Sequence, residues 1–262
     1  MKITQIRETE SAEAISVFNF ESFVEKIKVE TKARPVSGFR EALHYVLPGE
    51  PCHLSGKLPK IIPAVACGRV NGVKRMKAYN GIVELSVGPL AGKAEVEIVK
   101  KKAAELPQTK LAFMGSSGKT VKIWTYFTRP DGTLPQTQEE AEIFHAHAYR
   151  LAVKCYQPQL PFDIQMKEPL LDQYSRLSYD PELFYREDAV PFYLSQPFGM
   201  PAENSYREKT IAEKSPLSRA VPGYDTEDAL AVLYEAALRK TFEEMEAVSY
   251  THLRAHETTL HL

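Results

Sequence analysis

The residues best suited to chemistry lie in a short turn near the middle of the chain. Residues 115–118 are glycine and serine, and Lys119 and Lys122 follow them. Small residues leave backbone N–H groups open to a ligand, and hydroxyl and ammonium groups add further donors. Such a concave set of donors suits an anion, most simply a phosphate. The alternative is a tight hairpin whose lysines face solvent. The predicted phosphate or nucleotide site comprises Ser116, Ser117, Gly118, Lys119 and Lys122.

A P-loop is the other known motif that this turn partly matches. The run Gly118-Lys119-Thr120 fits the end of that motif, but its first glycine would fall at Phe113. A P-loop also opens a helix. Residues 121–127 instead alternate β-branched and aromatic side chains, which is typical of a strand. We therefore predict strand, turn and strand. A P-loop NTPase would require a helix over residues 118–130.

The elements before this hairpin indicate a layered fold. The turn Asn80-Gly81 introduces a second predicted strand, in which Glu84, Ser86 and Gly88 share one face and the intervening residues share the other. A helix rich in lysine and glutamate is predicted over 94–106. The order of strand, helix, strand, turn and strand favours α/β layering.

The flanking elements are predicted from periodicity and punctuation. Residues 1–34 resemble a lead-in with short helical pieces, of which 20–27 is the more apolar. A helix is predicted over 39–47 and a short strand over 61–67. Thr137 and Glu140 fit a capping box that opens a further helix. On that helix His145 and His147 lie two residues apart, so they cannot chelate one metal together, and we predict a structural or surface role.

The C-terminal quarter is predicted to lie outside the compact domain. Residues 194–223 are rich in proline, serine and glutamate, which is typical of a linker. Residues 225–247 predict one long amphipathic packing helix. Residues 248–262 closely resemble the translated read-through of a sequencing adapter found in metagenomic assemblies, and we treat them as a non-native tail. We expect the natural protein to continue where that tail begins.

Composition limits the possible partners. The 262 residues carry a net charge of −1, so any site for a polyanion must be a local basic patch. No apolar run approaches the ~20 residues of a membrane helix, and the N-terminus does not begin a secretory signal, so no membrane partner is expected. The three cysteines are widely spaced. Since they fit neither a zinc site nor a disulfide framework, we predict a cytoplasmic location.

Three sequence blocks stand in a recognisable order. They are the run from Tyr79 to Val83, the hairpin ending in Lys122-Ile123-Trp124, and Ser175-Arg-Leu-Ser-Tyr-Asp-Pro181, and the run from Phe144 to Tyr149 accompanies them. Together these blocks resemble the VirE N-terminal domain family of gut-bacterial mobile elements, a branch of the archaeo-eukaryotic primase (primase-polymerase) superfamily. The resemblance covers roughly residues 35–240.

The resemblance implies an α+β fold, with an RRM-like mixed or antiparallel sheet and helices packed on it. The primase-polymerase-like domain would span 35–193, followed by the linker and long helix over 194–247. It implies nucleotidyl transfer with two divalent cations, Mg²⁺ or Mn²⁺, held by carboxylates. The implied partners are a DNA template and nucleoside triphosphates, with a helicase-like ATPase module in the missing C-terminal part.

Carried onto this sequence, the resemblance assigns roles to several residues. Lys122 occupies the position at which many relatives have a histidine that faces the phosphates. Glu168 falls near the third acidic position and Arg176 matches the arginine that follows it. Asp180 matches the aspartate of the Ser-Tyr-Asp-Pro block, with a turn-forming role before the proline as the alternative. These three residues, Glu168, Arg176 and Asp180, are the catalytic candidates.

The first acidic motif departs from the family pattern. Its two metal-binding positions fall on Ser86 and Gly88, which carry no carboxylate. Glu84 lies on the same face, displaced by two residues or about 6.6 Å. It either reaches a metal in a shifted register or is a solvent-facing strand residue. Glu84 and Glu168 are the metal candidates. Two hypotheses follow. The chain is either a nucleotidyltransferase domain of a mobile-element replication protein, or a catalytically inactive DNA- or nucleotide-binding module derived from that fold.

Overall fold

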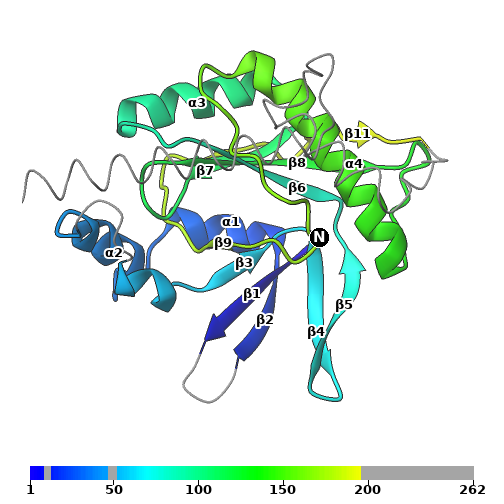
Figure 1. Cartoon of the computed structure of the whole chain (residues 1–262), viewed down its shortest axis with the longest axis horizontal. Helices are drawn as coiled ribbons and strands as arrows, with labels where there is room; N and C mark the ends of the chain where they lie inside the picture. The colour runs from blue at the N-terminus through cyan, green and yellow to red at the C-terminus, as the bar shows by residue number, and fades with distance from the viewer. Residues whose placement is uncertain (9–12, 47–51, 196–262) are drawn as a thin grey trace, which may run out of the picture. The chain divides into compact units, whose positions relative to one another are not determined.

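The computed structural model describes residues 1–8, 13–46 and 52–195 (Figure 1). The α-helices of this part of the chain are α1 (Phe20–Lys28), α2 (Pro35–Leu43), α3 (Lys93–Glu105) and α4 (Gln138–Tyr156), with 3-10 turns at His53–Lys57 and Gln157–Gln159. The strands are β1 (Lys2–Glu8), β2 (Glu13–Asn19), β3 (Lys60–Ile62), β4 (Val65–Val70), β5 (Val73–Tyr79), β6 (Ile82–Val87), β7 (Thr109–Met114), β8 (Val121–Thr128), β9 (Ser175–Arg176), β10 (Phe184–Tyr185) and β11 (Phe192–Tyr193). Residues 1–198 form one compact unit.

The central sheet is built around β8, which pairs antiparallel with β6 on one side and β7 on the other. β10 extends the sheet beyond β7, and β11 runs parallel to the end of β8. At the other edge, Ile164 forms a bridge with Val87, and the backbone N–H of Gln165 donates to Ser86 O at 2.7 Å. The order β6, α3, β7, β8, α4 and the segment around Ile164 is a βαββαβ arrangement with a split βαβ unit.

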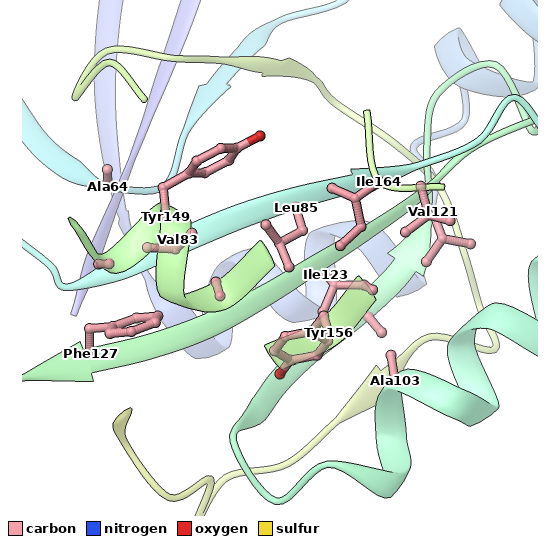
Figure 2. Packing of buried hydrophobic residues seen from close by; sticks show 14 of the residues in the cluster. Ala64, Val83, Leu85, Ala103, Val121, Ile123, Phe127, Tyr149, Tyr156 and Ile164 are labelled. Carbon is pink, nitrogen blue, oxygen red and sulfur yellow. The ribbon is translucent and has the colours of Figure 1, made fainter. Parts of the chain in front are cut away.

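One face of this sheet is covered by α3 and α4. The side chains of Val83, Leu85, Ile123 and Phe127 are fully buried there. Figure 2 shows these strand residues gathered with Ala103, Tyr156 and Ile164 into one apolar cluster. This face is apolar because alternation along each strand sends every second residue toward the helices.

The opposite face is covered by α1 and by β1 and β3. Trp124 is fully buried, and the ring of Phe23 stacks on it with centroids 5.0 Å apart and planes inclined by 5°. Phe20 and Phe113 meet the same indole edge-on. The central sheet therefore lies between two apolar layers, and the aromatic residues of this second face are core residues.

The N-terminal segment corrects the helical prediction for residues 1–34. Among the described residues of this segment, only those of α1 are helical. α1 covers the predicted piece over 20–27 and is preceded by the antiparallel strands β1 and β2. β1 also pairs with β3, whose residues lie more than 50 positions later in the sequence. Because those long-range partners stabilise the strands, local periodicity could not predict them.

Most other element predictions are confirmed. The hairpin is strand, turn and strand, and residues 121–128 form β8, which excludes a P-loop. The Thr137 side chain caps α4 by accepting from the Glu140 N–H at 3.3 Å. α2 begins at Pro35, earlier than predicted, because proline suits the first helical turn. The strand predicted over 61–67 is interrupted between β3 and β4.

The fold is α+β with antiparallel sheets and, over the described residues, four α-helices. The linker, the long C-terminal helix over 225–247 and the tail over 248–262 lie outside the described residues. Within the described ranges, no helix combines the length and apolar character that membrane spanning requires. Cys52, Cys67 and Cys155 are free thiols, as their spacing predicted.

Candidate functional site

Paired strands bring two predicted site residues together on the face that α1 covers. In the register of β6 and β8, Glu84 lies opposite Trp124 and Ser86 lies opposite Lys122. Directly paired residues of antiparallel strands point to the same face. Alternation along β6 and β8 therefore creates a polar cluster at the border of the apolar layer under α1.

The carboxylate of Glu84 is held from three directions. Its Oε2 accepts from the Trp124 indole N–H at 2.8 Å and from the Ser175 hydroxyl at 3.0 Å. Its Oε1 lies 3.4 Å from Lys122 Nζ. The side chains of Glu84 and Lys122 are 7% and 11% exposed, so this ion pair is largely withdrawn from water. Such a pair depends on its hydrogen bonds because both charges have lost solvent.

Lys122 bridges the glutamate to the serine next but one along β6. Its ammonium donates to Ser86 Oγ at 3.0 Å, and that hydroxyl donates to Gln165 Oε1 at 3.0 Å. The ammonium therefore lies between Glu84 and Ser86, on the face where the primase resemblance would place metal-binding carboxylates. A fixed positive charge stands at that position.

A second lysine reaches the cluster from the segment that runs past the edge of β6. The Lys167 backbone N–H donates to the Tyr149 hydroxyl at 2.9 Å, which anchors this segment to α4. Burial lowers the pKa of Lys167, the Lys122 ammonium lowers it further, and Glu84 partly offsets both. The Lys122 and Lys167 ammonium groups therefore both act on the Glu84 carboxylate, and a phosphate group could contact either of them.

A pocket opens beside this cluster. Glu84, Tyr149, Lys167 and Glu168 line it together with His145. The cavity itself is small, with a volume of about 20 Å³, which is room for about one water molecule. The pocket thus brings Glu84 and Glu168, the two residues predicted to bind metal, to one place, with Glu168 exposed at its rim.

His145 is part of the structure of this region. It is buried and its Nδ1 lies 3.1 Å from the Tyr79 hydroxyl, so the two groups share a hydrogen bond. Burial lowers the pKa of His145 to about 4, which keeps the ring neutral at physiological pH. Its structural role agrees with the prediction.

The hairpin turn lies in a different environment from Lys122. Ser116, Ser117 and Gly118 are half-buried and Lys119 is exposed. The Arg40 guanidinium donates to Gly115 O at 3.0 Å and to Ser116 O at 3.1 Å. The turn therefore presents backbone carbonyl groups to the Arg40 guanidinium of α2. Of the two hairpin lysines, Lys122 alone belongs to the Glu84 cluster.

Asp180 and Arg176 also lie in environments of their own. Asp180 is buried, and its Oδ2 accepts from Lys100 Nζ at 2.9 Å and from the Met114 N–H at 2.8 Å. Arg176 donates to Leu58 O at 2.9 Å and lies over the Tyr174 ring. The structure thus places Asp180 in an ion pair with α3 and Arg176 on β9 beside β3.

The donor set near Glu84 does not fit a divalent cation. Within the described part of the chain, no three His, Cys, Asp or Glu side chains converge as a metal site would require. Ser86 is engaged by Lys122. At Gly88 φ is +133° and an added Cβ would lie 2.8 Å from Lys119 O, so the backbone there resists a carboxylate-bearing residue. Mg²⁺ prefers several hard oxygen ligands, and one engaged carboxylate does not provide them.

Several residues of the cluster escaped sequence reasoning. Trp124 could have been found, because alternation along β8 places it on the same face as Lys122. On that face it lies opposite Glu84 of β6. Ser175, Gln165 and Lys167 could not, because the two-residue strand β9 and the irregular segment after Ile164 carry them to the cluster. The hydrogen bonds of these residues depend on tertiary packing.

Comparison with known proteins places this site within a family. Residues 53–185, which are 133 of the 262, match the family model described as BT4734-like, N-terminal domain. The chain belongs to this family. The matched region of the BT4734-like domain runs from the 3-10 turn at His53–Lys57 to β10, so it contains the Glu84 cluster and the hairpin. Neither the comparison with curated proteins nor that with solved structures gave a match.

Proposed function

We propose that this BT4734-like domain is a non-catalytic module that binds the phosphates of a nucleotide or nucleic acid in the replication of a mobile element. In this proposal it descends from a primase-polymerase related to the VirE N-terminal domain family. The observation that carries the proposal is the Lys122 ammonium, 3.0 Å from Ser86 Oγ and 3.4 Å from Glu84 Oε1. DNA and nucleoside triphosphates are its proposed partners, and a helicase-like ATPase module would follow it.

The sheet topology supports this descent. The βαββαβ order, with β6 and β8 in the middle of the sheet, is the arrangement that the primase-polymerase resemblance implies. RRM domains of this topology commonly stack bases on exposed sheet aromatics. Trp124 is fully buried under Phe23, so this face cannot serve as a base-stacking platform. The ligand must then approach the pocket at the sheet edge.

The electrostatics explain why binding would be kept when catalysis is lost. Two-metal nucleotidyl transfer needs carboxylates that hold both cations. Here Lys122 and Lys167 supply fixed positive charges on the chain itself, and Ser86 replaces a carboxylate with a neutral hydroxyl. A phosphate group is attracted to such ammonium groups as to point charges. The attraction to phosphate would remain, whereas within the described residues the carboxylates that two cations require do not converge.

The cavity size indicates which part of a nucleotide could enter it. A cavity of about 20 Å³ cannot enclose a nucleotide, so a phosphate group would bind at its open mouth. The base and sugar would then lie outside, which makes the proposed binding largely independent of base identity.

Direct titration tests the proposal. Trp124 is the only tryptophan of the chain and donates to Glu84, so its fluorescence reports on the cluster. We expect dATP to change the Trp124 emission in a saturable manner, and Lys167→Gln to weaken binding about tenfold, the loss of one charged contact. Lys101→Gln, an exposed lysine on α3, is the charge-matched control. A folded domain that gives no response to dATP would refute the proposal.

The second candidate function is an active nucleotidyltransferase that uses Mg²⁺ or Mn²⁺. It is favoured by one observation, the shared pocket of Glu84 and Glu168. Incubation with a primed DNA template, labelled dNTP and Mn²⁺ separates the two candidates. Extension that Glu168→Ala abolishes would establish the enzyme. Nucleotide binding without extension, unchanged by Glu168→Ala, is the result expected of the module.

A further inference from the structure

The hairpin of β4 and β5 forms a two-stranded ribbon with a tight turn at Asn71-Gly72. Both turn residues have positive φ, 51° and 77°, as a two-residue hairpin turn requires. Figure 1 shows the ribbon extending away from the central sheet beside the β1–β2 hairpin. An Asn-Gly turn and regular pairing make the ribbon a defined structural element.

The ribbon is strongly basic in a chain that is almost neutral. Residues 65–79 contain Arg69, Lys74, Arg75 and Lys77 and no Asp or Glu, whereas the whole chain has a net charge of −1. This is the local basic patch that a polyanion site on such a chain requires.

The two faces of the ribbon differ in what covers them. On the inner face Cys67 is buried and Met76 packs against the core. Arg69 donates to Glu13 O of β2 at 2.6 Å, and Lys74 pairs with Asp172 at 3.1 Å. The inner face is therefore occupied by contacts within the domain.

The outer face is open and carries the other two basic residues. Arg75 is paired with Gly68 in the ribbon register, and Lys77 lies across Gly68, where an added Cβ would be 2.0 Å from Lys77 Cε. Neither side chain has an ion-pair partner in the part of the chain that the structure describes. At the tip, Val70 and Val73 are 53% and 54% exposed.

We propose that the outer face of the β4–β5 ribbon binds duplex DNA, with Arg75 and Lys77 contacting phosphates on either side of a groove. A two-stranded ribbon has the width that the major groove admits. The exposed valines at the tip suit contact with thymine methyl groups or base edges. The tip has no Trp, Tyr or Phe, the residues that anchor membrane-surface segments, so charge and shape together favour DNA over a lipid surface.

The position of the ribbon connects this surface to the pocket. Ala64, which lines the pocket, immediately precedes β4, and Tyr79 at the end of β5 shares a hydrogen bond with the pocket residue His145. DNA held on the ribbon would therefore extend toward the phosphate pocket. The ribbon surface would hold the DNA partner of the proposed function, and in this respect the inference rests on that function.

Salt-dependent binding tests the inference. The anisotropy of a fluorescein-labelled DNA duplex is followed with the whole chain, without nucleotide, over a range of salt concentrations. We expect Arg75→Gln with Lys77→Gln to weaken binding at least tenfold at low salt and to reduce the slope of log K against log salt by about 2, one for each lost phosphate contact. Lys101→Gln with Lys154→Gln, exposed lysines on α3 and α4, changes the net charge equally and should leave both values unchanged.

A second variant tests the geometry of the ribbon without removing a charge. Gly68→Val places side-chain atoms where the Lys77 chain now lies, and should weaken duplex binding while the unfolding midpoint stays close to that of the wild type. The inference would be overturned if duplex affinity fell equally in the ribbon double variant and in the control double variant of α3 and α4. Binding to phosphatidylserine vesicles but not to duplex, or to single strands alone, would overturn it too. Because the Trp124 response to dATP should persist in the ribbon variants, failure of this inference is distinguishable from failure of the pocket.

Discussion

Lys122 Nζ lies 3.4 Å from Glu84 Oε1, across the paired strands β8 and β6. This pair joins a residue predicted to bind phosphate to a residue predicted to bind metal. The Lys122 ammonium neutralises the Glu84 carboxylate, which a bound metal cation would need as a ligand. The relationship therefore accounts for the lack of a fitting metal donor set around Glu84 among the described residues.

We predict that Lys122→Met destabilises the domain by about 3 kcal/mol, because it leaves the Glu84 carboxylate buried without its ion-pair partner. Urea unfolding followed by Trp124 fluorescence measures the free energy of unfolding. The double variant Glu84→Gln with Lys122→Met removes both charges and should recover most of the loss. Additive losses in the double variant would contradict the coupling.

The buried pair of Asp180 and Lys100 supports the second prediction. Their side chains are 1% and 4% exposed and the charged atoms lie 2.9 Å apart. Asp180→Asn should lower the free energy of unfolding by about 3 kcal/mol, since Lys100 then loses its buried partner. Asp188→Asn, an exposed acid in the same region, should change stability by less than about 0.5 kcal/mol. If Asp180 serves only in catalysis, its replacement would leave the unfolding midpoint unchanged.

Two glycines give a matched test of backbone strain. At Gly81 φ is +70° and an added Cβ would lie 2.3 Å from Phe127 O, so Gly81→Ala should cost at least about 2 kcal/mol. Gly38 lies within α2 with nothing near an added Cβ, and Gly38→Ala should stabilise by about 0.5–1 kcal/mol. Thermal unfolding compares the two. Similar effects of both substitutions would refute the assigned role of Gly81 in the turn before β6.

Burial of His145 predicts a dependence of stability on pH. Its pKa is about 4 in the folded state against an ordinary value of 6.5, so between these values the unfolded state binds a proton that the folded state does not. This contribution to stability is present in full above pH 6.5. It falls as the pH decreases through the window and levels off below about 4, with a total of about 3 kcal/mol.

The pH prediction is checked by urea unfolding of the wild type and of His145→Gln at a series of pH values. The difference in the free energy of unfolding between the two should vary with pH within this window. His44→Gln, which changes an exposed histidine, is the control and should follow the wild-type curve. Parallel curves for the wild type and His145→Gln would contradict the prediction.

Local periodicity predicted the elements that position the cluster. Alternation along β6 assigned Glu84 and Ser86 to one face of that strand, and alternation along β8 assigned Lys122 and Trp124 to one face of that strand. The register between β6 and β8 confirms both assignments. The Thr137 cap of α4 and the turn between β7 and β8 were also predicted. These features depend on residues within a few positions of one another, and a sequence displays them directly.

Other features needed long-range information. The strands β1 and β2 were missed because β1 is stabilised by β3 from a distant part of the chain. The surroundings of Asp180 and Arg176 differ from those of Glu84, although the sequence motifs suggested a common site. Arg176 lies on the two-residue strand β9 and Asp180 lies in an irregular segment, and no local periodicity indicates which element either residue contacts.

The family resemblance implied the α+β class, and the sequence by itself determined the strand–turn–strand hairpin and the absence of carboxylates at Ser86 and Gly88. Only the tertiary structure decided that Lys122 lies against Glu84, that Lys167 joins them, and that α1 closes the sheet face above Trp124. The physical reason is that the side-chain direction of a strand repeats every two residues, whereas the pairing of strands and the covering of a sheet follow from burial of apolar surface over the whole unit.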